Sequence, residues 1–124
     1  AIRSRGLGDV YKRQVYRTVF GLPSVDHNTL LIREYDFDRK YIPQTIELLN
    51  EVEEIGKDED IKVLALYPII ADKMDSLFVV YYYSSFEAMG DIIDRIGMSD
   101  AFQNVVNRAN EIGKLKTSNV VKII

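Results

Sequence analysis

Residues 77–83 read LFVVYYY, an uninterrupted run of seven aliphatic and aromatic side chains. Such a run is typical of a strand with both faces covered, because a strand with one solvated face alternates apolar with polar side chains. We therefore place it at the centre of a sheet. The residues SSFE follow directly, and they predict a helix start in which Ser84 accepts from the Glu87 amide while the Glu87 carboxylate reaches back. A central strand that leads straight into a helix indicates a fold that mixes the two.

Three further segments are predicted strands because they are rich in β-branched and aromatic residues: 29–37 (TLLIREYDF), 61–70 (IKVLALYPII) and 117–124. Pro68 interrupts the second of them. Since proline cannot donate to a ladder of hydrogen bonds, it indicates either a sheet edge or a bulge.

Two segments have helical periodicity. Residues 41–55 carry one apolar stripe and end at Gly56, which predicts an amphipathic helix. The second pattern begins at the SSFE run and breaks at Gly97. It then restarts with Ser99 as N-cap and runs to Gly113.

The predicted order is therefore βαββαβ, the ferredoxin-like arrangement of the α+β class. This arrangement is an antiparallel four-stranded sheet with two helices on one face. Many side chains of the other face are apolar or aromatic, and such a face needs a cover. The simplest cover is a second copy of the sheet. We therefore predict a homodimer that forms a dimeric α+β barrel.

The N-terminal segments call for a separate interpretation. Residues 4–14 (SRGLGDVYKRQ) resemble a translation of the transposase adapter used to build sequencing libraries, so we interpret residues 1–14 as an adapter-derived artefact on a metagenomic fragment. Residues 15–27 are predicted to be the remnant of an upstream strand and its linker, which would make an upstream tandem domain the partner. The alternative is an N-terminal extension that adds a strand or lies on the surface. Residues 28–124 are the predicted domain.

Charge and composition exclude several classes of function. Without the four basic residues and the one acid of residues 1–14, the chain has 12 basic and 18 acidic residues, a net charge of −6. This balance argues against nucleic-acid or anionic-membrane surfaces, which require a basic stripe. No apolar run approaches the roughly 20 residues that span a bilayer. The chain has no Cys, no zinc motif and no phosphate loop, so we expect no metal or cofactor and a cytoplasmic location.

The LFVVYYY strand, the SSFEAMGDIIDRIGMSDAFQNVV segment after it and the short last strand together resemble the dimeric α+β barrel superfamily. That superfamily includes antibiotic-biosynthesis monooxygenase-like domains and uncharacterised relatives. The resemblance covers residues 28–124. It implies a small-molecule site, whereas the haem-degrading branch, which depends on an Asn, a Trp and a His, is disfavoured. This chain has no Trp, and its one histidine, His27, precedes the first strand of the domain.

The candidate ligand-binding residues are polar or aromatic side chains on predicted strands: Arg33, Tyr35, Tyr67, Tyr81 and Tyr83. Arg33 would hold an anionic group and the phenols would orient a carbonyl or hydroxyl group. The competing interpretations are an internal salt bridge for Arg33 and plain strand packing for the tyrosines. We expect His27 to be solvated, although it could act as a base at a barrel mouth.

The acidic residues of 51–60 are best explained as a solvated helix end, because they lack the alternation and the fixed glycine of a calcium loop. Taken together, the sequence predicts a domain that binds a small apolar or aromatic molecule between sheet and helices or in the barrel lumen. One alternative is a cofactor-independent monooxygenase. The other is a non-catalytic dimerisation or interaction module, which predicts no cavity large enough for a ligand.

Overall fold

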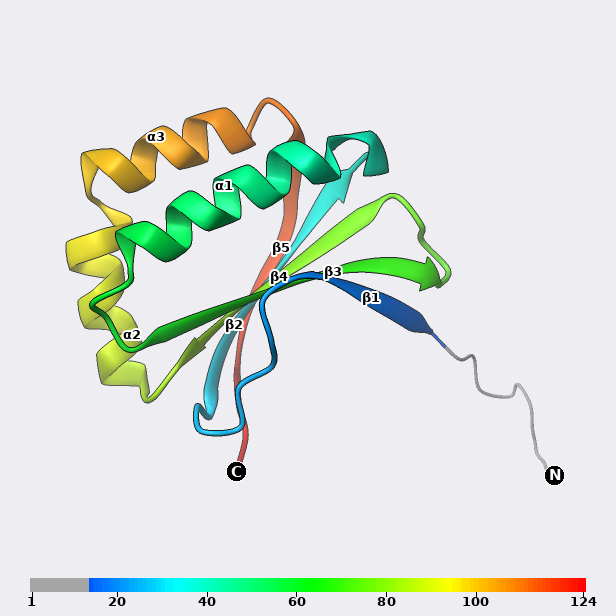
Figure 1. The fold of residues 1–124 in the computed structure, drawn as a ribbon. Helices are drawn as coiled ribbons and strands as arrows, with labels where there is room; N and C mark the ends of the chain where they lie inside the picture. Colours follow the sequence, from blue (N-terminus) through cyan, green and yellow to red (C-terminus); the bar gives the residue numbers. More distant parts are fainter. Residues whose placement is uncertain (1–13) are drawn as a thin grey trace, which may run out of the picture.

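The computed structural model describes residues 14–124, so the interpretation of residues 1–14 as adapter-derived lies, except for Gln14, outside the described residues. The chain forms one antiparallel sheet with helices on one face (Figure 1). In order, the elements are β1 (Val15–Phe20), β2 (Thr29–Phe37), η1 (Arg39–Tyr41), α1 (Ile42–Ile55), β3 (Ile61–Ile70), β4 (Ser76–Tyr83), α2 (Phe86–Ile92), the π-helix η2 (Ile93–Gly97), α3 (Asp100–Ala109) and β5 (Gly113–Lys122).

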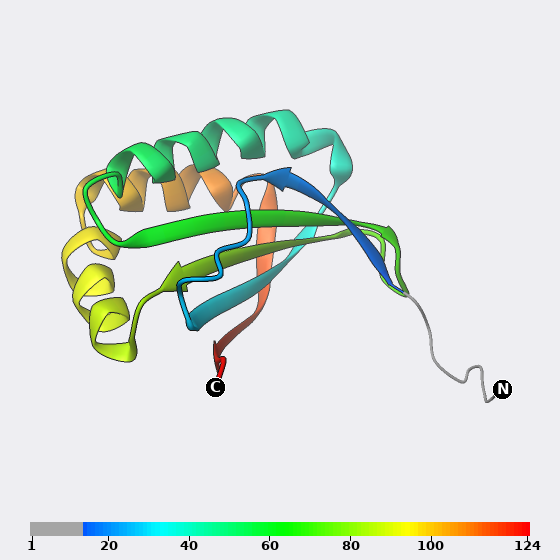
Figure 2. The same ribbon diagram turned by 60° about the horizontal axis from the view of Figure 1, so that its bottom comes forward.

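The sheet has the strand order β1-β3-β4-β2-β5, and every neighbouring pair is antiparallel. The four strands β3-β4-β2-β5 reproduce the ferredoxin-like order, so the predicted fold class is confirmed. Strand β4, the LFVVYYY run, lies between β3 and β2 and is buried along almost its whole length. Its predicted central place is therefore confirmed as well. Figure 2 shows the helices on the same side of the sheet.

Strand β1 is a fifth strand at the sheet edge, where it pairs with β3. Of the two predictions for residues 15–27, the structure shows the added strand, and an upstream tandem domain stays a prediction. Gly21 ends β1 with a φ of 76°, and a Cβ added there would lie 2.0 Å from the carbonyl oxygen of Val63. The turn that brings β1 against β3 thus depends on glycine.

Pro68 is accommodated because β3 has a neighbour on only one side at that point. The pairing of β3 with β4 ends at Leu66, whereas Pro68 lies opposite Tyr16 of β1, next to a register shift between Val15 and Tyr16. The prediction of an edge position or a bulge agrees with this arrangement, because Pro68 has a strand on one side only and lies next to a register shift.

Several predicted boundaries were wrong, among them the end of the last helix, because α3 ends at Ala109 and not at Gly113. The N-cap of α2 is Ser85, whose hydroxyl accepts from the Ala88 amide at 3.0 Å, and not Ser84. Strand β5 begins at Gly113 instead of residue 117, because its first residues pair with the end of β2. Ser99 caps α3 as predicted and accepts from the Phe102 amide at 3.2 Å.

Alternate residues of β4 supply two apolar clusters. Leu77, Val79, Tyr81 and Tyr83 face the helices and pack in the main core with α1, α2 and α3. The other face, which we call the open face, has a smaller cluster of Leu64, Val80 and Tyr82, with Leu30, Ile32 and Leu66 packed against it. None of the helices formed by residues 14–124 has the length and hydropathy of a membrane-spanning segment.

Candidate functional site

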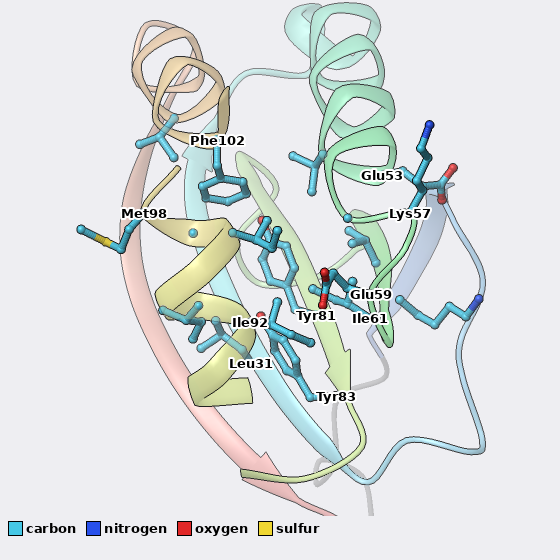
Figure 3. Close-up of a pocket in the computed structure, with 18 of the residues that line it drawn as sticks. Leu31, Glu53, Lys57, Glu59, Ile61, Tyr81, Tyr83, Ile92, Met98 and Phe102 are labelled. Carbon is cyan, nitrogen blue, oxygen red and sulfur yellow. The ribbon is translucent and has the colours of Figure 1, made fainter. Parts of the chain in front are cut away.

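A cavity of about 500 Å³ lies between the sheet and the helices. Strands β2, β3 and β4 supply its floor, and α1, η2 and α3 supply the opposite wall. Figure 3 shows the rings of Tyr81 and Tyr83 between Ile92 and Phe102 on one side and Glu59 and Ile61 on the other. The volume of this cavity falls within the range of small-molecule sites.

Arg33 places a positive charge in the floor of this cavity. The side chain is half-buried, and its Nε donates to Ser118 Oγ at 3.3 Å. Among residues 14–124 no carboxylate lies within ion-pair distance of the guanidinium, so the expected internal salt bridge is not formed. A partly desolvated charge without a counter-charge favours an anionic or acceptor group from a ligand.

Tyr81 and Tyr83 lie beside Arg33 with only 7% and 3% of their surfaces exposed. Burial raises the pKa of both phenols, and the nearby guanidinium of Arg33 opposes this shift. Both phenols are therefore neutral at physiological pH and can donate a hydrogen bond. The hydrogen bonds formed within the described part of the chain use neither hydroxyl, and both residues line the cavity.

The other two candidate tyrosines lie in different surroundings. Tyr35 lines a smaller, adjoining cavity together with Arg33 and Tyr81. Tyr67 lines neither cavity: its ring packs edge-on against Phe37 at 6.0 Å between centroids, with Arg39 over it at 5.8 Å. The structure thus brings four of the five candidates together and places Tyr67 in the packing role.

An ion-paired cluster crosses the rim of the larger cavity. Arg95 of η2 donates to both oxygens of Glu59, at 2.7 and 3.1 Å, and also to Asp91 Oδ2 at 2.7 Å. The bonds to Arg95 lower the pKa of both carboxyl groups and raise the pKa of the guanidinium. This cluster joins the loop after α1 to the π-helix, and π-helical turns often occur at functional sites.

The sequence did not single out the rest of the cavity lining, which includes Ile92, Ile96, Met98 and Phe102 on the helix side and Glu59 in the loop after α1. One signal was available. This signal is the helix break at Gly97, where the structure has a π-helical turn of the kind that often lies at functional sites. The acidic residues of 51–60 showed no pattern that would have separated Glu59 from its solvated neighbours.

His27 is buried, and the prediction of a solvated histidine was wrong. Its Nδ1 lies 2.6 Å from Ser24 Oγ and its Nε2 lies 2.7 Å from Asp60 Oδ1. The hydrogen bond from His27 is the main reason why the pKa of Asp60 is lowered. These contacts hold the segment between β1 and β2 against Asp60, the residue before β3. His27 lines neither cavity.

Two acidic residues of α1 form ion pairs. Glu51 pairs with Arg108 of α3, and Glu54 accepts from Lys57 at 2.6 Å. Within residues 14–124 no group of three or more His, Asp or Glu side chains could hold a metal ion. The candidate site is therefore the larger cavity, which has Arg33 and two neutral phenols at its floor.

Comparisons with known proteins show similarity in fold only. No protein-family model matches the chain, and no curated protein is detectably similar in sequence. Among solved structures, the crystal structure of a putative monooxygenase from Lactobacillus acidophilus NCFM superposes with a TM-score of 0.54 at 8% identity. The match covers 90% of this chain and 49% of that chain, so this chain spans about half its length. The likeness shows that the chain has the ferredoxin-like α+β fold.

Proposed function

We propose that this domain binds a small, largely apolar molecule through one anionic or strongly accepting oxygen. The observation that carries the proposal is the Arg33 guanidinium, which faces a cavity of about 500 Å³ without a carboxylate partner in residues 14–124. A charge-assisted hydrogen bond from such a group is about twice as strong as a neutral one.

The neighbouring phenols strengthen this preference. Because burial keeps Tyr81 and Tyr83 neutral, each can donate a hydrogen bond to a ligand in the cavity that Arg33 also lines. A guanidinium with neutral hydrogen-bond donors in the same cavity favours a phenolate, enolate or carboxylate over its protonated form. The apolar wall, which includes Ile92, Ile96 and Phe102, would hold the ring or hydrocarbon part of the ligand.

The test uses para-nitrophenol, whose ionised form absorbs visible light and whose neutral form does not. We expect binding to lower the ionisation midpoint of the probe, because the site stabilises the phenolate. Nitrobenzene has almost the same shape without the acidic hydroxyl, and it should bind more weakly. An unchanged midpoint for the bound probe, or equal affinity for the two compounds, would contradict the proposal.

The structural likeness supports monooxygenation as the reaction of the bound molecule, and we propose that this reaction uses no bound cofactor. The substrate would be its own reductant. A methylene group activated beside a carbonyl loses both of its hydrogens and gains one oxygen atom of dioxygen, and the second oxygen atom leaves with those hydrogens as water. Arg33 would stabilise the enolate oxygen that forms when the first proton departs.

Mass spectrometry with isotopically heavy dioxygen and anthrone as the probe substrate tests this reaction. We expect one heavy oxygen atom in the product and a rate that depends on the protein. Product without heavy oxygen, or turnover equal to that in buffer, would exclude monooxygenation of this probe class. Binding of para-nitrophenolate would still be expected. A purely structural interaction module would lack both results, and the size of the cavity argues against it.

We also propose that a second copy of the chain covers the open face. Leu64, Val80 and Tyr82 at the centre of this face are already buried within the chain. The half-buried, uncharged Leu30, Ile32 and Leu66 beside them fit a symmetric contact in which the same patch meets itself. Light scattering over a range of concentrations should show a dimer. Ile32→Glu, which adds a half-buried charge on that face, should raise the dissociation constant at least about tenfold. A monomer at all concentrations would point to a tandem domain or to no partner.

A further inference from the structure

We infer that the smaller cavity is a second subsite for the same ligand, and that Thr45 of α1 is its polar contact. This inference rests on the proposed function and extends it. The ligand would carry, beyond the oxygen held by Arg33, a ring-sized apolar group that bears one further hydrogen-bonding oxygen.

The two cavities adjoin each other. They share Arg33 and Tyr81 from the sheet, Val52 from α1, and Phe102 and Val106 from α3. Arg33 thus stands at their junction, and a ligand whose oxygen it binds can extend in both directions. The smaller cavity continues toward β5 between α1 and α3.

The volume and lining of the smaller cavity fit one ring. It measures about 140 Å³ and is bordered mainly by aliphatic and aromatic side chains such as Leu48, Leu77 and Val105. An engineered apolar cavity of about 150 Å³ stays dry and binds benzene or xenon. A benzene-sized group is therefore the natural occupant by size.

Thr45 is the polar exception in this lining. The residue is 94% buried, and Oγ1 is the one fully buried side-chain oxygen or nitrogen of residues 14–124 without a hydrogen-bond partner. A helical threonine often returns its hydroxyl to the carbonyl of the preceding turn, which here would be that of Tyr41, but no such bond is formed. Buried polar groups are almost always paired, so an orphan hydroxyl calls for an explanation.

A ligand oxygen supplies that explanation. Valine has nearly the same shape as threonine and would fill this place without leaving a polar atom unpaired. Threonine in a helix has two accessible χ1 rotamers, so a rotation can exchange Oγ1 with Cγ2 and turn the hydroxyl toward the cavity. The hydroxyl can therefore reach a ligand without any movement of α1.

The experiment compares phenol with benzene as probes, using the whole chain and methyl signals in NMR titrations. Methyl groups of Leu48, Leu77 and Val105 report on the smaller cavity, whereas those of Ile92 and Ile96 report on the larger one. We expect both probes to shift the first set and phenol to bind more tightly than benzene. In Thr45→Val the affinity for phenol should fall about three- to tenfold, the range expected for one net hydrogen bond.

Two controls separate a binding role from a structural one. Benzene should bind Thr45→Val at least as tightly as the original chain, and the melting temperature should stay the same or rise because an unpaired hydroxyl has been removed. Thr45→Ser keeps the hydroxyl and should keep the preference for phenol. Equal loss of phenol and benzene binding in Thr45→Val, or unchanged phenol binding, would overturn the inference.

The two proposals can fail separately. If phenol shifts only the Ile92 and Ile96 methyl groups while para-nitrophenolate binds as proposed, the second subsite is wrong and the proposed function stands. If para-nitrophenolate does not bind and benzene-sized probes shift neither set of methyl groups, both are wrong.

Discussion

Arg33→Met is expected to lower the affinity for para-nitrophenolate between about 10- and 100-fold, the range that one charge-assisted hydrogen bond provides. Methionine keeps an unbranched side chain of similar reach in the floor of the cavity, so the change removes the charge with little loss of packing. Because the substituted site no longer favours the anion, the lowered ionisation midpoint of the bound probe should return toward that of the free probe. The absorbance of the phenolate measures both effects.

Three comparisons make this result specific to the charge. Nitrobenzene should bind Arg33→Met as well as it binds the original chain. Arg33→Lys keeps the charge but not the planar donor array, and should give an intermediate affinity. Glu34→Gln alters the adjacent residue, which points to the open face, and should change neither affinity nor midpoint. If Arg33→Met binds the phenolate as tightly as before, Arg33 has only a structural role.

Gly21→Ala is expected to destabilise the native state by about 3 kcal/mol or more. A left-handed backbone costs a residue with a Cβ about 1–2 kcal/mol, and the new Cβ would in addition lie 2.0 Å from the Val63 carbonyl oxygen, within the backbone of β3. The chain can respond by releasing β1 or by unfolding at lower denaturant concentration. Urea denaturation measures the stability, and hydrogen exchange of the β1 amides shows whether the strand has detached.

Gly90→Ala is the matched control. Gly90 lies in α2, and a Cβ added there meets nothing within 4 Å. Alanine is the better helix former, so this substitution should stabilise the chain by about 0.5–1 kcal/mol. If Gly21→Ala leaves both stability and exchange of the β1 amides unchanged, the close approach of the Gly21 turn to β3 does not hold in solution.

Local sequence was sufficient for the elements whose pattern reflects their own surroundings. The LFVVYYY run could be placed at the centre of the sheet because only a strand covered on both faces needs seven apolar or aromatic side chains in succession. Likewise, the break at Gly97 and the cap at Ser99 are signals contained within a few residues. Together with the predicted strands 29–37, 61–70 and 117–124 and the predicted helix 41–55, these elements lead to the ferredoxin-like order and the fold class.

Features that depend on distant partners were missed or misplaced. The sequence gives no sign that His27 meets Asp60, which lies 33 residues further on. Strand β5 starts with the polar residues GKLK, which become a strand only because β2 offers them a partner. Adjacent serines made the cap of α2 ambiguous by one residue. Whether Arg33 has an ion-pair partner depends on where every nearby carboxylate lies in the folded chain, and the sequence does not give those positions.

The lysines of strand β5 oppose edge-to-edge association of the sheet into fibres. Its far edge is unpaired in the part of the chain that the structure describes, and nearly all of its residues are exposed. Lys114, Lys116 and Lys122 lie along it. If two copies met edge to edge, these lysines would bring like charges together, and edge lysines are a common means by which sheets resist such pairing. Strand-by-strand extension of the sheet is thus opposed at the edge where backbone groups are most available.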